Sequence, residues 1–283
     1  MKPIPGKIVV FGQYKTGTTA LFTKIRNSLP ASEFEPRTLF EPLGYQPEAL
    51  DDARWVLAKT ILKFVGHPQS VDYESFFRFD RRIYLTRDPR DWLVSAALFI
   101  CQEKRSVFDD QESTQWVLDY LHRKEAEPQR HPIKELLDYV FALPPSTPLE
   151  LIAERTRDQQ AFCMEIEERL QDNYLRLRYE DFVDERLEPL RNYLELDLDG
   201  DVNVGREFAH VRRTCSHSDW KNWLTQEDEQ FFRPYFDAYI RRYGYEGDWT
   251  PNERPRIDPD HGSRYVDRVI HMKRQRLAAQ GRG

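Results

Sequence analysis

Cysteine is scarce in this sequence of 283 residues, and its three copies, Cys101, Cys163 and Cys215, are odd in number and far apart. A small secreted domain held together by disulfides carries many paired cysteines, so the sequence falls outside that class. The C-x-x-C spacing of a zinc site is missing, and Cys215 and His217 are interpreted as ordinary loop residues. We therefore expect no metal centre.

Long apolar runs and an excess of basic residues are also missing. No segment approaches the ~20 apolar residues of a membrane-spanning helix, and the N-terminal MKPIPGKIVVFG contains no long apolar stretch. The formal net charge is -6 and the sequence pI is about 5.7, so no overall basic field attracts nucleic acid. These absences predict a cytoplasmic protein with neither a membrane nor a nucleic-acid partner, and they leave open whether copies of the chain associate.

The length allows one sizeable α/β core, since single domains of this size are common. The sequence contains no internal repeat and no low-complexity linker. We therefore expect one domain over residues 1–283.

The N-terminal stretch GKIVVFGQYKTGTTALF, residues 6–22, joins an apolar run to a Gly/Thr-rich turn and a helix pattern. Residues 8–11 are continuously apolar, as in a strand buried on both faces of a parallel sheet. Four apolar residues then recur at helical spacing, namely Leu21, Phe22, Ile25 and Leu29. Backbone N–H groups between strand and helix would face one concavity, where the helix dipole also favours an anion. The stretch therefore predicts a strand, a phosphate-binding loop and a helix.

The spacing within this loop departs from that of the ATP-binding Walker loop. Gly12 and Gly17 have the Walker separation, but Thr18 stands where the Walker lysine belongs. The lysine lies inside the loop instead, as Lys15, from where its ammonium could reach the bond that breaks beyond the phosphate. Thr18 and Thr19 add hydroxyl donors at the start of the helix. An ordinary strand–Gly–helix junction with a nearby lysine is the alternative that these residues leave open.

The string YKTGTTAL resembles the 5'-phosphosulfate loop of the sulfotransferases, in which a Lys-(Ser/Thr)-Gly-Thr-Thr run holds 3'-phosphoadenosine 5'-phosphosulfate (PAPS). Ala20 departs from the pattern, because many members carry an aromatic residue there. The resemblance implies an α/β fold with a central parallel sheet flanked by helices, related to the P-loop NTPases. It also implies that the donor is bound by Lys15, Thr16, Gly17, Thr18 and Thr19.

A second motif lies in DRRIYLTRDPRDWLVSAALF, residues 80–99. Its apolar centre predicts a buried strand, after which Asp88 and Pro89 are favourable as N-cap and first residue of a helix. The Arg-Asp-Pro-Arg-Asp run resembles the 3'-phosphate motif of the sulfotransferases, which implies that Arg87 and Ser95 bind the 3'-phosphate. Taken alone, the run is better explained as a capped helix start with a local ion pair, and the first loop is what favours the phosphate motif.

The general base is the least defined part of the predicted site. Glu41 precedes a proline and is expected on an extended segment, facing either a cleft or solvent. A strand predicted over residues 54–60 places Lys59 at the sheet edge where ligands bind in open α/β folds. Cytosolic-type sulfotransferases carry their base in a Lys-Thr-His step, but Ile61 replaces the histidine here. A Phe-Glu-Pro step resembling that of carbohydrate sulfotransferases ranks Glu41 above His67 as the base.

Two further segments contribute to the predicted site. Residues 101–170 are charged and helical in pattern, and we expect them to cap the cleft on the acceptor side. NYLRLRYEDF, residues 173–182, alternates as a strand does. Its Tyr179 is either a core aromatic residue or, as the resemblance implies, the residue that contacts the adenine.

The segment VRRTCSHSDWKNWLT, residues 211–225, resembles the part of the sulfotransferases that folds over the 3'-phosphate. Its Asp-Trp-Lys-Asn run matches directly, and counting back from it places Arg213 on the arginine of the family pattern. Thr214, Cys215 and Ser218 replace a lysine and two glycines, so this lid should be stiffer, and Arg212 could stand in for the lysine. Residues 260–283 are expected to form a basic helix on the surface.

Four motifs in the expected order, from residue 12 to residue 222, predict a PAPS-dependent sulfotransferase. The expected product is 3'-phosphoadenosine 5'-phosphate (PAP), and the acceptor is a hydroxyl or amine of a small molecule or carbohydrate. A small-molecule P-loop kinase using ATP and Mg²⁺ is one alternative, although it would lack the Walker lysine and leave Arg87, Ser95 and Arg213 without a role. An inactive nucleotide-binding homologue is the other; the missing histidine favours it, whereas Glu41 and Lys15 oppose it.

Overall fold

The computed structural model describes residues 6–30, 36–46, 55–63, 70–171, 173–202, 213–214 and 216–281. The chain divides into two compact units. Unit 1 comprises Met1–Arg87 and Asp158–Gly205, and unit 2 comprises Asp88–Arg157 and Arg206–Gly283. Whether both belong to one domain over residues 1–283 stays a prediction.

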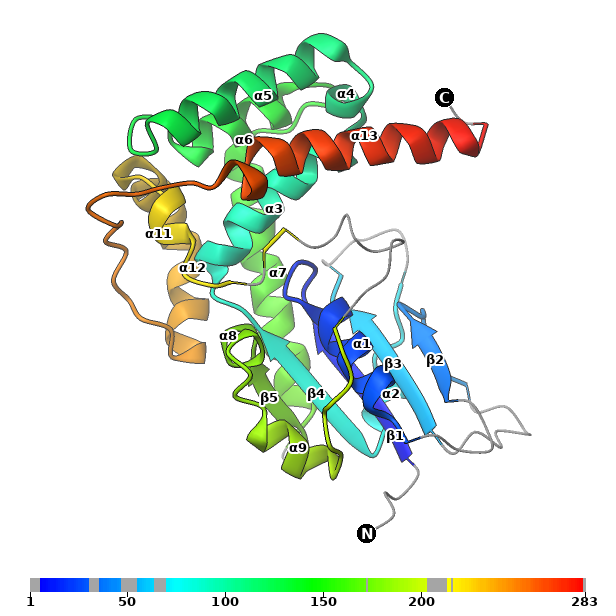
Figure 1. Cartoon of the computed structure of the whole chain (residues 1–283). Coiled ribbons are helices and arrows are strands. Elements are labelled where there is room, and N and C mark those ends of the chain that lie inside the picture. The colour runs from blue at the N-terminus through cyan, green and yellow to red at the C-terminus, as the bar shows by residue number, and fades with distance from the viewer. Residues whose placement is uncertain are drawn as a thin grey trace. The chain divides into compact units, whose positions relative to one another are not determined.

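Unit 1 is built on a five-stranded parallel sheet with the strand order β2-β3-β1-β4-β5 (Figure 1). The strands are β1 (Gly6–Gly12), β2 (Arg37–Phe40), β3 (Trp55–Ile61), β4 (Arg81–Thr86) and β5 (Leu175–Arg178). The continuous apolar run of β1 is explained by its central place, because it pairs with β3 on one side and β4 on the other. The α/β parallel sheet expected from the sequence is thereby confirmed.

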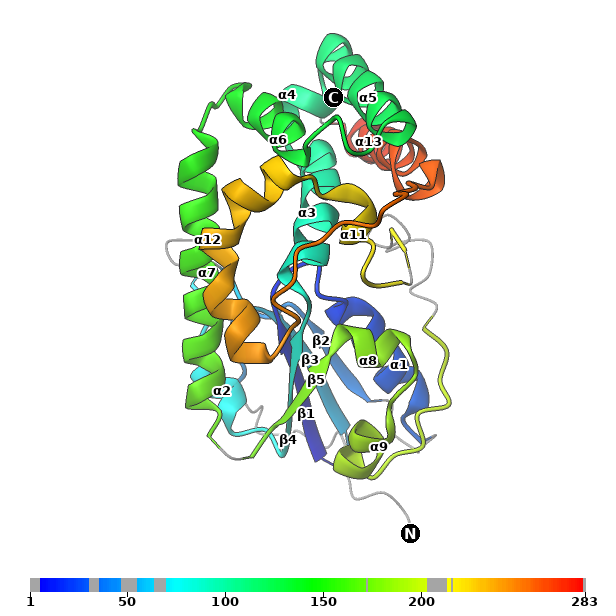
Figure 2. The same ribbon diagram turned by 90° about the vertical axis from the view of Figure 1, so that its left-hand side faces the viewer.

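Helices cover both faces of this sheet (Figures 1 and 2). One face packs against α1 (Thr18–Ser28), α8 (Tyr179–Val183) and α9 (Glu188–Leu194), through a core that joins alternate strand residues such as Ile8 and Val10 to Leu21 and Leu190. The opposite face packs against α2 (Glu74–Phe77) and the second half of α7 (Leu149–Arg169). There the ring centroids of Phe11 and Phe77 are 6.1 Å apart.

The strand order defines where a ligand is expected. From β1 the chain passes to β2 and β3 on one side of the sheet, and then crosses to β4 and β5 on the other. In open parallel sheets the crevice at such a reversal, outside the carboxyl ends of the strands, is the usual ligand site. The loop that follows β1 lies at this reversal.

Two details of unit 1 differ from the sequence-based expectation. The segment before Glu41 forms the short strand β2, so the strand predicted over residues 54–60 is the third along the chain. Tyr179 does not continue its strand but begins α8, directly after β5. Alternation over so few residues fits a strand and the first turn of a helix equally well, which is why the sequence misplaced this boundary.

Unit 2 is helical and includes the first turns of α7. Its other elements are α3 (Pro89–Glu103), α4 (Arg105–Phe108), α5 (Gln111–Ala126), α6 (Ile133–Ala142), α11 (Trp220–Trp223), α12 (Gln226–Tyr243), the 3-10 turn η2 (Pro259–His261) and α13 (Ser263–Ala279). The basic helix expected at the C-terminus is α13, and its apolar side, with Tyr265, Val266, Val269 and Ile270, is buried in the core of the unit.

The N-terminus of α3 has the predicted cap. Asp88 accepts a hydrogen bond from the backbone N–H of Arg90, and Pro89 is the first helical residue. Its missing N–H costs nothing at this position, because the first N–H groups of a helix have no partner within the helix. The helix therefore begins where the sequence predicts.

Each unit contains a free, buried thiol. Cys101 lies on α3 in unit 2, and Cys163 lies on α7 in the part that belongs to unit 1. Burial raises the pKa of both thiols to about 12. Both are therefore protonated and unreactive in the folded chain at neutral pH. Cys215 lies outside the described residues.

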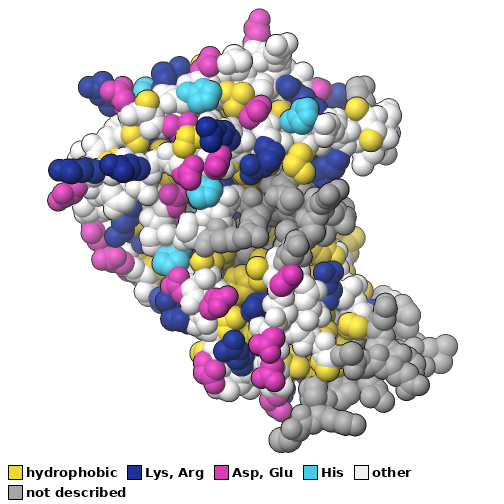
Figure 3. Space-filling model, in the orientation of Figure 1, with side chains coloured by type: hydrophobic (Ala, Val, Ile, Leu, Met, Phe, Trp, Pro, Cys, Tyr) yellow, Lys and Arg dark blue, Asp and Glu magenta, His cyan; other side chains and the backbone are white. Residues whose placement is uncertain are grey.

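Figure 3 shows lysine and arginine side chains interspersed with aspartate and glutamate on the part of unit 2 that carries α5 and α13. This mixture agrees with the small net charge of the chain. None of the helices within the described ranges combines the length and the apolar character that crossing a bilayer requires.

Candidate functional site

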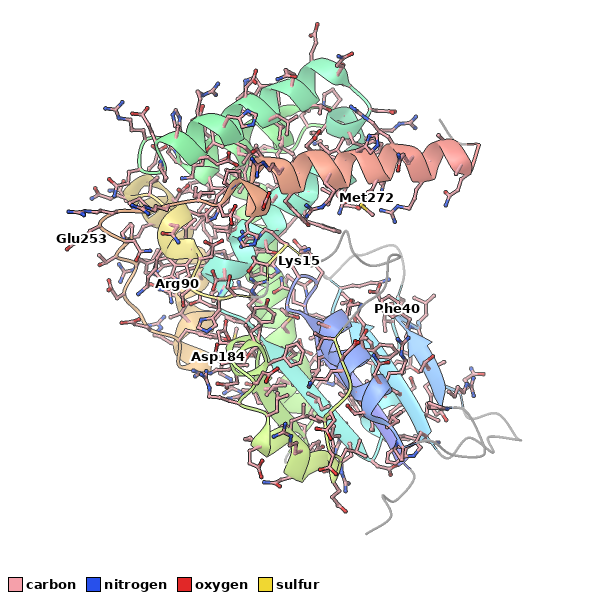
Figure 4. The ribbon with its side chains drawn as sticks, in the orientation of Figure 1. Lys15, Phe40, Arg90, Asp184, Glu253 and Met272 are labelled. Carbon is pink, nitrogen blue, oxygen red and sulfur yellow. The ribbon has the colours of Figure 1, made fainter. Side chains whose placement is uncertain are left out.

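The loop between β1 and α1 is a compact turn with two residues in left-handed conformation. Lys15, labelled in Figure 4, has φ 62° and Gly17 has φ 90°. The backbone N–H and the hydroxyl of Thr16 both donate to the carbonyl oxygen of Gln13, at 3.3 and 2.6 Å. A Cβ atom at Gly12 would lie 2.6 Å from Cγ2 of Thr18. The loop can close this tightly only because Gly12 has no side chain.

Tyr179 packs directly against the loop. A Cβ atom at Gly17 would lie 2.6 Å from Cδ2 of this tyrosine, so glycine is required there by space as well as by its positive φ. The guanidinium carbon of Arg87 lies 4.3 Å from the centre of the same ring, which is a cation–π contact. The aromatic ring thus contacts both the phosphate loop and the arginine that follows β4.

Arg87 is attached to the loop and is buried. Its Nη1 donates to the carbonyl oxygen of Lys15 at 2.8 Å, and the residue is 6% exposed. Its Nε is buried and has no acceptor among the residues that the structure describes. A buried guanidinium N–H normally has an acceptor, so this one fits an anionic group bound beside the loop.

An ion pair between the buried Lys59 and the exposed Glu41 lies at the same edge of the sheet. Lys59 Nζ is 2.6 Å from Oε1 of Glu41 and donates to the hydroxyl of Thr19 at 3.0 Å, which connects the pair to the first turn of α1. Lys59 is the fifth residue of β3, opposite Val10. Burial lowers the pKa of Lys59, and the carboxylate of Glu41 opposes this effect.

The backbone holds Glu41 in an uncommon conformation. The residue has φ 52°, and its N–H donates to the carbonyl oxygen of Lys59 at 2.8 Å. A non-glycine residue in this region is strained by about 1–3 kcal/mol, and such residues occur preferentially at functional sites. Phe40, labelled in Figure 4, precedes Glu41, and Nζ of Lys59 lies 4.0 Å from its ring centre.

Unit 1 therefore brings together most of the residues expected in the site: Lys15, Thr16, Gly17, Thr18, Thr19, Glu41, Lys59, Arg87 and Tyr179. Ser95 and Arg213 belong to unit 2, where Ser95 is a buried residue of α3. His67 and Arg212 lie outside the described residues. Within the described ranges, no three His, Cys, Asp or Glu side chains form a group able to hold a metal ion.

Arg213 is buried in unit 2 with one end of its guanidinium bound. Nη1 donates to Oδ2 of Asp219 at 2.8 Å and to the carbonyl oxygen of His261 at 3.3 Å. Nε and Nη2 are buried and have no acceptor in the part of the chain that the structure describes. The guanidinium carbon lies 5.9 Å from the ring centre of Trp223.

The segment around Asp219 has a partner on α3 that the sequence does not reveal. The carboxylate of Asp91 accepts the backbone N–H groups of Ser218 and Trp220, the latter at 2.9 Å. In the sequence, Asp91 is only an acidic residue in the first turn of a helix, which the helix dipole explains without any partner. No local pattern indicates that it binds residues more than a hundred positions away.

No protein-family model and no curated protein sequence matches this chain. Among solved structures, that of mouse sulfotransferase SULT7A1 complexed with PAP is similar, with a TM-score of 0.46 and 15% identity, over 83% of this chain and 84% of the other.

Proposed function

We propose that this chain transfers a sulfuryl group from PAPS to a hydroxyl or amine of an acceptor. The observation that carries the proposal is the attachment of Arg87 to the phosphate loop through the carbonyl of Lys15, with its buried Nε lacking an acceptor among the described residues. A second phosphate beside the 5'-phosphate site would supply that acceptor. ATP has no phosphate on the 3' hydroxyl of its ribose, whereas PAPS carries one there.

The loop and its neighbours fit such a donor. The 5'-phosphate would be held by the loop N–H groups and by the hydroxyls of Thr18 and Thr19 at the N-terminus of α1. Arg87, Ser95 and Arg213 are assigned to the 3'-phosphate, as the motif resemblance implies. Tyr179 is assigned to the adenine, as the same resemblance implies.

PAPS, when bound, supplies a sulfuryl group that is already activated by its bond to phosphate. The acceptor oxygen or nitrogen forms a bond to sulfur while the bond from sulfur to the bridging oxygen breaks. Lys15 is assigned to neutralise the charge that develops on this bridging oxygen, which is the usual largest contribution of a preorganised site. The proton of the acceptor passes to the carboxylate of Glu41, which Lys59 holds in place.

The surroundings of Glu41 bear on the acceptor. Phe40 and Leu43 are 40% and 49% exposed, so apolar surface is available on both sides of the carboxylate along the chain. Such surface suits a small-molecule alcohol or the apolar face of a sugar ring. The acceptor class proposed is therefore a small molecule or a carbohydrate.

The donor is tested by calorimetric titration of the protein with PAP, set against ADP with Mg²⁺. We expect PAP to bind more tightly, because only PAP carries a 3'-phosphate for Arg87. A preference for ADP with Mg²⁺, together with an activity that EDTA abolishes, would replace the proposal with a kinase. Tight PAP binding without transfer to any acceptor would indicate an inactive homologue.

Replacing Arg87 with alanine is expected to weaken PAP binding by about 10- to 100-fold, the effect of losing a charge-assisted hydrogen bond to phosphate. The affinity for ADP should change much less. Arg186→Ala is the matched control, because Arg186 is an exposed arginine of unit 1 whose side chain pairs with Asp181 and Asp184. Equal losses of PAP and ADP binding in Arg87→Ala would contradict the assignment.

Replacing Glu41 with glutamine is expected to lower kcat by about 10²- to 10⁴-fold, the range of general-base catalysis, with the Kd for PAP nearly unchanged. Steady-state rates and calorimetry measure the two quantities separately. Glu74→Gln removes an equivalent carboxylate from an exposed ion pair with Arg169 and should leave both unchanged. Normal turnover in Glu41→Gln would reject Glu41 as the base and make His67 the next residue to test.

A further inference from the structure

The guanidinium of Arg213 is held at one end and open along one edge. Its side chain is 2% exposed, and Nη1 is occupied by Asp219 and by the carbonyl oxygen of His261. Nε and Nη2, which have no acceptor within the described ranges, form the edge of a guanidinium that binds two oxygens at once. This edge matches the geometry of a phosphate, for which arginine is the usual bidentate partner.

Asp219 is the residue that orients this guanidinium. Its Oδ2 accepts from Nη1 of Arg213 at 2.8 Å and from Nε1 of Trp223 at 3.1 Å. The carboxylate is thereby shared between the arginine and an indole of α11. A shift of the backbone at Asp219 would move the guanidinium of Arg213, because the Asp219 carboxylate is hydrogen-bonded to it.

The backbone on both sides of Asp219 is fixed by Asp91. The carboxylate of Asp91 is buried and accepts the N–H of Ser218 through one oxygen and the N–H of Trp220 through the other. Ser218 has φ 61°, a left-handed conformation that serine adopts rarely. At this position the sulfotransferase pattern has glycine, so the hydrogen bond that the N–H of Ser218 donates to Asp91 stabilises a turn for which the side chain of Ser218 is unfavourable.

A neighbour of Asp91 on α3 also helps to hold the Ser218–Trp220 segment against the first turn of this helix. Arg90, labelled in Figure 4, has its guanidinium carbon 4.0 Å from the ring centre of Trp220. Its Nε and Nη2 donate to the two carboxylate oxygens of Asp88, at 2.9 and 2.7 Å. The first turn of α3 therefore holds Trp220 by its backbone and by its ring.

We infer that Asp91 is a positioning residue for the 3'-phosphate of the nucleotide. It fixes the backbone of Ser218–Trp220, so that Asp219 presents the Nε and Nη2 edge of Arg213 to the phosphate oxygens. The inference rests on the proposed function, because it takes the nucleotide to carry a 3'-phosphate. Asp91, the last residue of the Arg-Asp-Pro-Arg-Asp run, would then contribute to the selection of the donor as well as to the first turn of α3.

The test compares PAP with 5'-AMP, which differs from PAP only in lacking the 3'-phosphate, by calorimetry or competition. Asp91→Asn keeps the size of the side chain but leaves one oxygen to accept two N–H groups. We expect the Kd for PAP to rise about tenfold and the Kd for 5'-AMP to stay within about twofold. Asp267→Asn, at an exposed position of α13, is the matched control and should change neither.

Arg213→Ala should show the same selective loss, and Asp91→Asn combined with Arg213→Ala should lose no more than Arg213→Ala alone. Additive losses would mean that Asp91 acts independently of Arg213, and would overturn the inference. An unchanged PAP affinity, or an equal loss for both nucleotides in Asp91→Asn, would overturn it as well.

Two outcomes keep the inference distinct from the proposed function. If the unmodified chain binds PAP no more tightly than 5'-AMP, the proposed function fails, and the inference fails with it. If the unmodified chain prefers PAP and Asp91→Asn keeps that preference in full, only the inference fails. Should Asp91→Asn not fold, Asp219→Asn is measured in the same way, and a retained preference for PAP in that variant overturns the inference.

Discussion

Replacing Lys15 with methionine is expected to lower kcat for sulfuryl transfer by about 10²- to 10³-fold, which is the effect of removing one preorganised group that stabilises developing charge. Methionine has an unbranched side chain one atom shorter than that of lysine and faces the same constraint at φ 62°, so the substitution removes the charge with little change in the loop. The bond between Arg87 and the carbonyl oxygen of residue 15 is made by the backbone and should persist. The Kd for PAP should therefore rise only about threefold.

Steady-state rates at saturating PAPS, with calorimetric titration of PAP, separate the two effects. Lys273→Met provides the control, because this lysine lies on α13 and makes an ion pair with Glu103. A variant at Lys15 with kcat within threefold of the unmodified chain would show that the loop lysine does not act on the leaving oxygen. A large loss of PAP affinity with unchanged kcat would assign it to binding instead.

Replacing Asp228 with alanine is expected to destabilise unit 2 by about 3–5 kcal/mol, a cost typical of breaking a buried, hydrogen-bonded charge cluster. The Asp228 side chain is fully buried and accepts four hydrogen bonds, from the N–H groups of Ile133 and Lys134 and from the N–H and hydroxyl of Thr225. It thereby caps α6 and forms the capping box of α12 at the same time.

Lys124 increases the cost of this substitution. The residue is fully buried, and burial lowers its pKa to about 8, while the charge of Asp228 opposes that shift. Without the charge of Asp228, the Lys124 ammonium keeps the hydrogen bond from Nζ to the carbonyl oxygen of Pro128, at 2.7 Å, and the favourable charge of Glu135. Its charged form should become still less favourable, which adds to the loss of the caps.

Tryptophan fluorescence in a urea titration measures this loss, because five of the six tryptophans belong to unit 2. A thermal scan should show a decrease of about 10 °C in Tm. Asp237→Ala, at an exposed position of the same helix, should change the free energy of unfolding by less than about 0.5 kcal/mol. A similarly small change in Asp228→Ala would mean that other groups satisfy the ends of α6 and α12.

The parts of the fold that the sequence predicted are those decided by neighbouring residues. The buried strand β1, the turn between Gly12 and Gly17 and the start of α3 at Asp88 each depend on a few consecutive side chains. Apolar runs, left-handed glycines and helix caps act within one or two turns of the backbone, so a local pattern is sufficient. The parallel sheet follows because such a strand must be paired on both sides.

The contacts that the sequence did not predict join distant positions. Lys59 and Glu41 were both expected near the ligand, but nothing in two segments 18 residues apart shows that they form an ion pair. Asp91 lies 127 and 129 residues from its two partners. Such pairs depend on how the helices and strands pack. A carboxylate that is exposed to solvent and one that accepts a hydrogen bond from a distant backbone N–H can have the same neighbours in the sequence.

The two buried thiols allow the opening of unit 1 and the opening of unit 2 to be measured separately. A thiol-reactive dye in the absence of denaturant can modify Cys163 only when unit 1 opens around it, and Cys101 only when unit 2 does. Peptide mapping of the dye after increasing times would therefore give two opening rates from one unmodified sample. If the two rates coincide, the chain opens as one cooperative body. If they differ, the unit whose cysteine is modified faster is the less stable one.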